Sequence, residues 1–255
     1  MKSITIKNVT IGEGMPKICV PIVGITKNDI LEEIEKAILL NIDLLEWRVD
    51  WYEHCLDVQK IIQMLKEIKK VTKEIPIIFT FRTAREGGAK DISVEEYAAL
   101  LDSILPSQQL DIIDIELFAG DAIVLSLLQK ARECSVYTIL SSHDFQKTPE
   151  EQEIIMRLCH MQELGSDMTK IAVMPHNTKD VLTLLSATEK MQHYGDRPFI
   201  TMSMGGLGSI SRMAGEVFGS AITFGVGEKS SAPGQIETKK LKHVLNIIHE
   251  SIAML

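Results

Sequence analysis

The sequence predicts an eight-stranded α/β barrel, a (β/α)8 TIM barrel that occupies residues 1–255 as one domain. Short apolar runs alternate with longer segments of helical period, which is the pattern of βα units and a parallel sheet. Eight such pairs fit within about 240 residues, the usual size of a closed barrel, whereas a doubly wound open sheet more often has about five or six strands. Because no linker rich in Pro, Gly or Ser interrupts the series, we expect a single domain.

Each element has its own signal along the chain. The first is a hairpin over residues 4–11, in which apolar residues flank Lys7 and Asn8, with Gly12 and Gly14 closing it. The expected strands cover residues 17–23, 44–48, 76–82, 111–116, 135–142, 169–174, 198–203 and 221–226. The expected helices cover residues 28–40, 56–73, 93–105, 121–133, 149–164, 179–194, 209–218 and 235–254. Thr148 before Pro149 and Asn177 before Thr178 are helix-start signals.

Composition and charge exclude several classes of protein. The net charge is −8 and the basic residues are scattered, so we expect no nucleic-acid partner. The N-terminus lacks the apolar stretch of a signal peptide and no run has the length of a membrane span, so we expect a cytoplasmic protein with no membrane partner. The four cysteines and the histidines lack the spacing of metal ligands, and we expect neither a metal nor a cofactor.

Ionisable residues stand inside several of the expected strands. Side chains alternate along a strand, so Glu46 and Arg48 share one face while Leu45, Trp47 and Val49 share the face that suits the helices. The other ionisable residues in or directly after strands are Arg82, Glu86, Asp114, Glu116, His143 and Lys170. Barrel active sites collect residues from the carboxyl ends of several strands, so these side chains predict one at that end.

A purely structural role competes with this interpretation for each residue taken alone. Glu46 and Arg48 could form a simple internal ion pair, and Asp114 and Glu116 fit a supporting role as partners of Lys170 and the arginines. For the whole set that explanation is weak, because buried ion pairs are rarely a net gain in stability.

Lys170 is the candidate nucleophile. The small Ala172 leaves space for its amine to reach a ligand, and an amine near apolar groups and other cations loses its proton more readily, which supplies the neutral form needed for imine formation. His143 could be an ordinary core histidine, but its position at a strand end among polar residues favours general acid and base chemistry. These residues predict an enzyme acting on a ketone.

The same residues lie in motifs that resemble the type I 3-dehydroquinate dehydratases of the shikimate pathway, over most of the chain. The most specific motifs are Glu46-Trp47-Arg48-Val49-Asp50, Phe79-Thr80-Phe81-Arg82 with Glu86-Gly87-Gly88, Ser142-His143-Asp144-Phe145, Lys170-Ile171-Ala172-Val173-Met174-Pro175, Ser211-Arg212 before Gly215-Glu216-Val217-Phe218-Gly219-Ser220, and Ser231-Ala232-Pro233-Gly234-Gln235. Several long motifs in the family's order make this a strong resemblance.

The resemblance implies a barrel whose N-terminal hairpin closes its base, often as a homodimer, and a role in aromatic amino acid biosynthesis or in quinate degradation. It implies a hydro-lyase that removes water from 3-dehydroquinate to give 3-dehydroshikimate, without a cofactor. Lys170 would form an imine with the C3 ketone. His143 would take the C2 proton and later protonate the C1 hydroxyl, and Glu86 would orient and tune His143.

The resemblance also implies the substrate-binding residues. Arg212 would pair with the ring carboxylate, a geometry for which guanidinium is suited. The remaining implied contacts are Glu46, Arg48 and Arg82 with the C4 and C5 hydroxyls, Met202 and Phe224 with the ring, and Ser231 and Gln235 on a closing segment from Gly227 to Gln235. Pro21 departs from the family pattern, since some relatives have a serine there, and one minor hydroxyl contact is therefore in doubt.

Two other functions remain open from the residues alone. A class I aldolase could use Lys170 to cleave a sugar phosphate held by the glycine turns at 204–209 and 225–227. A non-catalytic sensor of cyclic carboxylates would need Arg212 but would leave Lys170 and His143 without a role.

Overall fold

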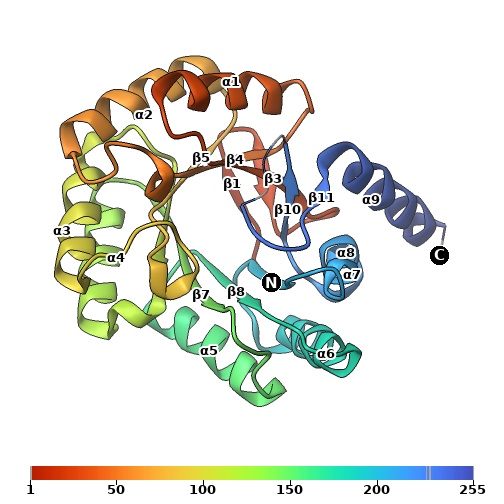
Figure 1. The fold of residues 1–255 in the computed structure, drawn as a ribbon. Coiled ribbons are helices and arrows are strands. Elements are labelled where there is room, and N and C mark those ends of the chain that lie inside the picture. The colour runs from red at the N-terminus through yellow and green to blue at the C-terminus, as the bar shows by residue number, and fades with distance from the viewer. Residues whose placement is uncertain (1, 228, 230, 255) are drawn as a thin grey trace.

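The computed structural model describes residues 2–227, 229 and 231–254, and its centre is a curled sheet of nine strands (Figure 1). Neighbouring strands of this sheet run parallel, in the order β11-β10-β3-β4-β5-β6-β7-β8-β9. The barrel strands are β3 (Lys17–Ile22), β4 (Leu44–Arg48), β5 (Ile77–Thr80), β6 (Ile112–Glu116), β7 (Tyr137–Asp144), β8 (Met168–Val173), β9 (Phe199–Ser203) and β10 (Ile222–Val226), and β11 is Ile236–Glu237. All eight expected strands are confirmed.

The two ends of the sheet meet between β9 and β10. The Ala221 N–H donates to the Phe199 carbonyl at 2.8 Å, and the Thr201 N–H donates to Ser220 Oγ at 3.0 Å. A serine side chain thus satisfies a backbone donor at this seam, and the sheet curls into the predicted TIM-barrel-like α/β fold.

Helices surround the sheet and follow the strands in turn (Figure 1). They are α1 (Lys27–Ile38), α2 (Val58–Thr72), α3 (Val94–Ile104), α4 (Asp121–Glu133), α5 (Glu151–Leu164), α6 (Thr178–Tyr194), α7 (Ser209–Met213), α8 (Gly215–Phe218) and α9 (Thr238–Ala253). Single turns of 3-10 helix are η1 (Val49–Trp51), η2 (Ala84–Glu86), η3 (Leu105–Ser107) and η4 (Leu117–Ala119). Among the described residues no helix is both long and apolar enough to cross a membrane.

Two sequence expectations about helices are corrected. The segment 209–218 is two short helices, because the backbone of Ala214 between them has φ −96° and ψ 15° and leaves the helical conformation. Thr148 does not cap α5; its hydroxyl donates to the Met174 carbonyl at 3.0 Å. Asn177 does cap α6, accepting from the Asp180 N–H at 3.1 Å.

The apolar core has two layers separated by the sheet. Outward-facing strand residues such as Leu45 and Trp47 pack under the helices. Inside the barrel, Leu44 belongs to an apolar layer that also contains Ile6 and Ile11 of the hairpin β1 (Ile4–Ile6) and β2 (Val9–Ile11). The hairpin therefore closes the amino-terminal end of the barrel, as predicted, and leaves polar side chains to the carboxyl ends of the strands.

Candidate active site

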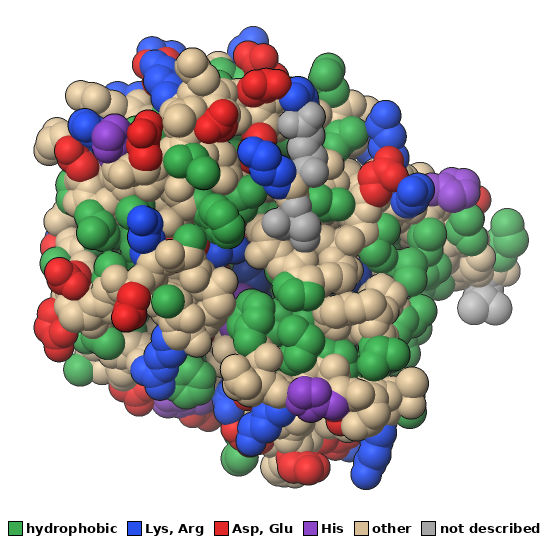
Figure 2. Space-filling view, viewed as in Figure 1, with side chains coloured by type: hydrophobic (Ala, Val, Ile, Leu, Met, Phe, Trp, Pro, Cys, Tyr) green, Lys and Arg blue, Asp and Glu red, His purple; other side chains and the backbone are tan. Residues whose placement is uncertain are grey.

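A cavity opens at the carboxyl ends of the strands, with about 440 Å³ of empty space that is partly open to solvent. Figure 2 shows basic and histidine side chains at the bottom of a hollow near the centre of this face. The predicted site residues that line the cavity are Glu46, Arg48, Arg82, Glu86, His143, Lys170, Met202, Arg212, Phe224, Ser231 and Gln235. The structure thus brings together every predicted site residue, from the five strands β4, β7, β8, β9 and β10, the residues after β5, η2, α7 and the segment before β11.

Sequence reasoning gave no site role to two large side chains of the cavity wall, Phe145 and Met204. Phe145 directly follows β7 and Met204 directly follows β9. Both positions carry a signal, because residues that follow a barrel strand face the carboxyl end, and Phe145 also stands in the Ser142-His143-Asp144-Phe145 motif. Pro21 is not among the lining residues.

Lys170 is buried on β8, and its amine is held by anions and an aromatic face. Its Nζ lies 3.4 Å from Glu46 Oε1 and 3.7 Å from Asp114 Oδ2. It also lies 4.3 Å from the centre of the Phe224 ring, a favourable cation–π distance. Two carboxylates therefore face the amine. Asp114 was expected from the sequence as a partner of Lys170, whereas the approach of Glu46 differs from the apolar and cationic surroundings that the sequence suggested.

Arg82 sits at the centre of a group of carboxylates. Its Nη2 donates to Asp114 Oδ1 at 2.8 Å, and its Nη1 donates to Glu116 Oε1 and to Ser141 Oγ, both at 3.0 Å. Burial lowers the pKa of Arg82, but the carboxylates more than offset it and raise the pKa well above its ordinary value. Arg82 is therefore a fixed cation whose donors largely face inward, as the supporting role of Asp114 and Glu116 predicted.

Arg48 pairs with Asp50 and not with Glu46. Its Nε and Nη2 each donate to one oxygen of Asp50 at 2.8 Å, and Asp50 also accepts the Ala89 N–H at 2.9 Å. Glu46 instead accepts from the Thr80 hydroxyl at 3.0 Å and faces Lys170. The simple Glu46–Arg48 ion pair considered from the sequence is wrong, because Asp50 lies in the 3-10 turn η1, where strand alternation no longer applies.

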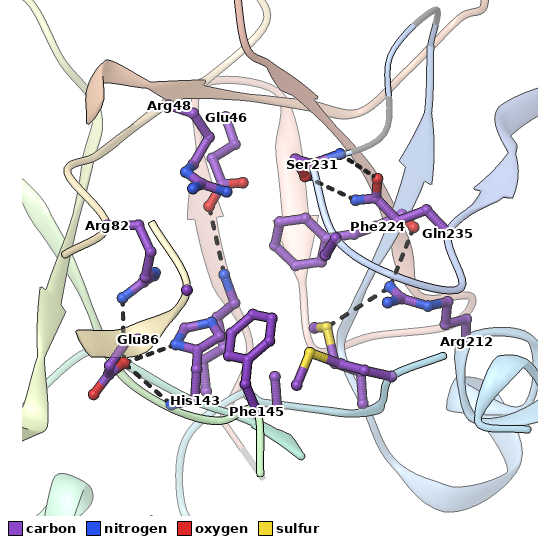
Figure 3. A pocket seen from close by; sticks show the side chains of 16 residues that line it. Glu46, Arg48, Arg82, Glu86, His143, Phe145, Arg212, Phe224, Ser231 and Gln235 are labelled. Carbon is purple, nitrogen blue, oxygen red and sulfur yellow. Dashed lines mark hydrogen bonds and ion pairs between the residues drawn. The ribbon is translucent and has the colours of Figure 1, made fainter. Parts of the chain in front are cut away.

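His143 and Glu86 form a hydrogen-bonded pair (Figure 3). Glu86 Oε2 is 2.9 Å from His143 Nδ1 and also accepts the His143 backbone N–H at 3.1 Å. These two contacts fix the ring so that Nε2 is left for other chemistry. The C-cap of η2, Gly87, has φ +82°, and an added Cβ would lie 2.3 Å from the Phe145 ring. A glycine is therefore needed to place Glu86 beside His143.

The surroundings move the pKa values of this pair in opposite directions. Burial, then the cations Arg82, Lys170 and Arg48, lower the pKa of His143 well below 6.5. Burial is the largest cause that raises the pKa of Glu86 to about 8; Glu116 and Asp114 add to it, while Arg82 and the His143 N–H oppose it. The imidazole is therefore neutral at neutral pH, the form that can accept a proton.

Arg212 lies across the cavity from the His143–Glu86 pair (Figure 3). Its Nη2 donates to the Pro233 carbonyl at 3.2 Å and its Nη1 to the Phe224 carbonyl at 3.5 Å, while Nε has no hydrogen-bond partner among the described residues. Burial lowers the pKa of Arg212 to about 10. Nη1 also contacts Met202 Sδ at 3.7 Å. A buried guanidinium whose partners among the described residues are neutral carbonyl oxygens and a sulfur atom attracts an anionic ligand.

The segment before β11 covers the cavity next to Arg212 (Figure 3). Ser231 N–H donates to Gln235 Oε1 at 2.9 Å, and Gln235 Nε2 donates to Ser231 Oγ at 3.0 Å. The Pro233 carbonyl, which binds Arg212, also accepts the Gly205 N–H at 3.1 Å. Positions 228 and 230 of the expected closing segment lie outside the described residues. The described part is seated on the loop after β9.

Fold and site together define an α/β-barrel enzyme whose pocket combines an amine, a neutral histidine paired with a carboxyl, and a guanidinium that lines the cavity opposite them. Within the described ranges there is no group of three or more His, Cys, Asp or Glu that could hold a metal.

Comparison with known proteins gives the family. A family model of type I 3-dehydroquinase matches residues 18–252, and the chain belongs to this family. A 3-dehydroquinate dehydratase of Clostridioides difficile is 50% identical over 252 residues, covering 98% of this chain and 99% of that protein.

Two solved structures have the same fold over nearly the whole chain. A crystal structure of the type I 3-dehydroquinate dehydratase of Clostridium difficile, with covalently modified comenic acid, has 49% identity and a TM-score of 0.94, and the match covers 98% of each chain. The 3-dehydroquinate dehydratase of Geobacillus kaustophilus HTA426 has 39% identity and a TM-score of 0.95, covering 98% of this chain and 97% of that one.

Proposed function

We propose that this chain is a 3-dehydroquinate dehydratase that removes water from 3-dehydroquinate, through an imine on Lys170, to give 3-dehydroshikimate. The observation that carries the proposal is that one cavity holds the Lys170 amine, the His143–Glu86 pair and, opposite them, Arg212. An amine alone would fit any ketone. The guanidinium and the neutral histidine narrow the substrate to a ketone with a carboxylate and an acidic α-hydrogen.

The reaction starts at Lys170. Its ammonium gives a proton to a neighbouring base, for which Glu46 Oε1 at 3.4 Å is placed. The neutral amine attacks the C3 ketone, and the ketone oxygen leaves as water, so that a protonated C=N bond replaces C=O. A proton next to a ketone is weakly acidic. The iminium accepts the electron pair as an enamine, so the lysine supplies the electron sink.

His143 carries the proton through the next two steps. Its neutral ring takes the C2 proton, and the electron pair forms the enamine. The pair then returns to expel the C1 hydroxyl, which leaves as water with the proton that His143 accepted. A water molecule then enters, hydrolyses the iminium, and releases the product and the free Lys170 amine. A lowered pKa suits this cycle, because the imidazolium formed in the first step is a strong enough acid to protonate the hydroxyl.

Glu86 acts through His143. It holds the ring by Nδ1 and by the backbone N–H, so the proton transfers occur at Nε2. We propose that Glu86 orients and tunes the base and does not itself exchange a proton with substrate.

The remaining lining residues recognise the substrate. Arg212 would pair with its carboxylate through donors that now contact only carbonyl oxygens and a sulfur atom. Glu46, Arg48 and Arg82 would contact the C4 and C5 hydroxyls, although the inward contacts of Arg82 leave it fewer donors for this purpose. Met202 and Phe224 would pack on the ring, and Ser231 and Gln235 would close the cavity and exclude water.

A continuous assay of product tests this function. 3-Dehydroshikimate contains a conjugated enone, so incubation with 3-dehydroquinate should raise ultraviolet absorbance, and Lys170→Ala should abolish the rise. Retro-aldol cleavage of sugar phosphates, measured in parallel, separates this function from that of a class I aldolase. Cleavage without dehydration would overturn the proposal, and binding of 3-dehydroquinate without either reaction would indicate a sensor.

We also propose that the chain is one domain, forms a homodimer and serves the shikimate pathway in the cytoplasm. Exposed apolar side chains on α7, α8 and α9 support a subunit contact, among them Ile210, Val217 and Ile247 (Figure 2). In analytical ultracentrifugation the wild-type protein should sediment as a dimer, and Ile247→Glu should dissociate to monomers at a higher protein concentration than wild type. A wild-type monomer at all concentrations would contradict the assembly without affecting the chemistry.

A further inference from the structure

One oxygen of Asp114 has no hydrogen bond, although the side chain is fully buried. Oδ1 accepts from Arg82 Nη2 at 2.8 Å and from the Ser141 hydroxyl at 2.6 Å. Oδ2 has no hydrogen-bond partner among the described residues, and it lies 3.7 Å from Lys170 Nζ. Buried polar atoms nearly always have a partner, so an oxygen left in this way calls for a functional explanation. The two contacts at Oδ1 fix the carboxylate and aim Oδ2 at the amine.

Asp114 is charged at neutral pH. Burial raises its pKa, but Arg82, Lys170 and the hydrogen bond from Ser141 outweigh burial, and the pKa lies below its ordinary value. Asp114 is therefore a permanent anion beneath the nitrogen that, in the proposed function, becomes the imine.

Glu46, the other carboxylate near Nζ, is placed differently. Its Oε1 already accepts the Thr80 hydroxyl, and its side chain lines the cavity, where a substrate hydroxyl can reach it. Asp114 does not belong to the cavity lining and is 0% exposed. A substrate can therefore draw Glu46 away from the amine, while Asp114 stays in place.

The chemistry of the nitrogen fits a single fixed acceptor. An ammonium has three N–H bonds, whereas an iminium keeps the positive charge with one N–H. If that proton leaves, the neutral imine is a much weaker electron sink. In a site that excludes water, a neighbouring anion stabilises the protonated iminium and raises its pKa.

We propose that Asp114 Oδ2 is the counter-ion of the Lys170 nitrogen and accepts the single N–H of its iminium. This inference rests on the proposed imine function. The other groups that face or influence this nitrogen are Glu46 on β4, the Phe224 ring on β10, His143 on β7, Arg82 after β5 and Cys19 on β3. Only Asp114 combines a full negative charge, complete burial and an oxygen without a hydrogen bond.

The test is the pH dependence of reductive trapping. Cyanoborohydride reduces the protonated iminium far faster than the neutral imine, so the rate of adduct formation on the Lys170 peptide with 3-dehydroquinate follows the protonated fraction. Asp114→Asn keeps the shape of the side chain and an oxygen for Arg82 and Ser141 but removes the charge. Glu116→Gln is the matched control. Glu116 also binds Arg82, so this variant removes one carboxylate charge beside the same arginine, but Glu116 does not face Lys170.

Asp114→Asn should move the alkaline fall of the trapping rate to lower pH by roughly one to three units, the usual effect of an opposite charge at this distance. Glu116→Gln should follow the wild-type profile. An unshifted profile in folded Asp114→Asn, or an equal shift in both variants, would overturn the inference while leaving the imine intact. Absence of any wild-type adduct would overturn the proposed function and this inference with it.

Ser141→Ala covers the case in which Asp114→Asn does not fold. It keeps the charge but removes one of the two hydrogen bonds that aim Oδ2. We expect a smaller shift in the same direction, with circular dichroism confirming the fold. If Ser141→Ala folds and keeps the wild-type pH profile, the claim that Ser141 orients the Asp114 carboxylate toward Lys170 is contradicted.

Discussion

Glu86 Oε2 lies 2.9 Å from His143 Nδ1 and also accepts the backbone N–H of His143. One carboxyl oxygen therefore holds both the ring and the main chain of the proposed base. The second oxygen, Oε1, is buried without a hydrogen-bond partner among the described residues. This carboxyl also shares Arg82 with Glu116 and Asp114, so three acidic groups surround one cation.

The burial of Glu86 beside two other acidic groups predicts that the stability of the protein depends on pH. Glu86 keeps its proton in the folded state up to a pKa of about 8, whereas its ordinary pKa is 4.5. Between these values unfolding releases a proton, so the free energy of unfolding should fall as pH rises, by at most about 1.4 kcal/mol per pH unit. Glu86→Gln should lose this dependence. Urea unfolding at pH 5 and pH 8 measures it, and a difference between wild type and variant that is the same at both pH values would contradict the raised pKa.

The surroundings of His143 predict a ring that stays neutral in mildly acidic solution. Burial and the nearby cations lower its pKa well below 6.5. In an NMR titration, the ring resonance that disappears in His143→Ala should therefore have its midpoint below that of the free side chain. A midpoint at or above 6.5 would show that the cations do not act on the ring as described.

The proposed pairing of the Arg212 guanidinium with the substrate carboxylate predicts that a change at Arg212 weakens substrate binding. Arg212→Lys keeps the charge but removes the planar fork, and loss of a charged hydrogen bond worth about 1.5–3 kcal/mol should lower kcat/KM roughly 10- to 100-fold. Arg132→Lys is a suitable control, because Arg132 is remote from the cavity and donates to the Gly165 carbonyl. The decrease should fall mainly on KM. An unchanged KM would remove Arg212 from carboxylate recognition.

Gly234 predicts how the closing segment can be opened without removing a polar group. Its φ is +76°, and an added Cβ would lie 2.1 Å from the Gly205 carbonyl oxygen. Gly234→Ala should unseat the segment, raise its sensitivity to protease and weaken substrate binding. Gly14→Ala is the matched control, since Gly14 also has positive φ, +63°, but no atom lies within 4 Å of the added Cβ. Equal protease sensitivity in the two variants would argue against the packing of the closing segment on Gly205.

Strand periodicity was sufficient to predict the barrel and which faces point inward. Alternation placed Glu46 inside and Trp47 outside, and both positions are confirmed because the sheet has one apolar layer on each side. Alternation stops where a strand ends. The partner of Arg48 is Asp50, in the turn η1, and no local pattern could reveal that the chain folds back there.

Long-range contacts set the electrostatics of the site, and these could not be read from the sequence. The sequence placed Lys170 among apolar groups and cations with Asp114 as a possible partner, and its nearest charged neighbours are Glu46 and Asp114, which are 124 and 56 positions away. Their approach depends on the stagger of strands around the barrel. The sequence identified Lys170 and proposed Asp114 as a partner, but only the fold identified Glu46 as the second carboxylate beside the amine.

Peptide mass analysis after borohydride reduction tests the central claim most directly. Protein reduced in the presence of 3-dehydroquinate should carry one adduct on the peptide that contains Lys170. Lys170→Ala should carry none, whereas His143→Ala should still form the adduct, more slowly. No adduct in wild type, or an adduct that persists in Lys170→Ala, would contradict the imine mechanism.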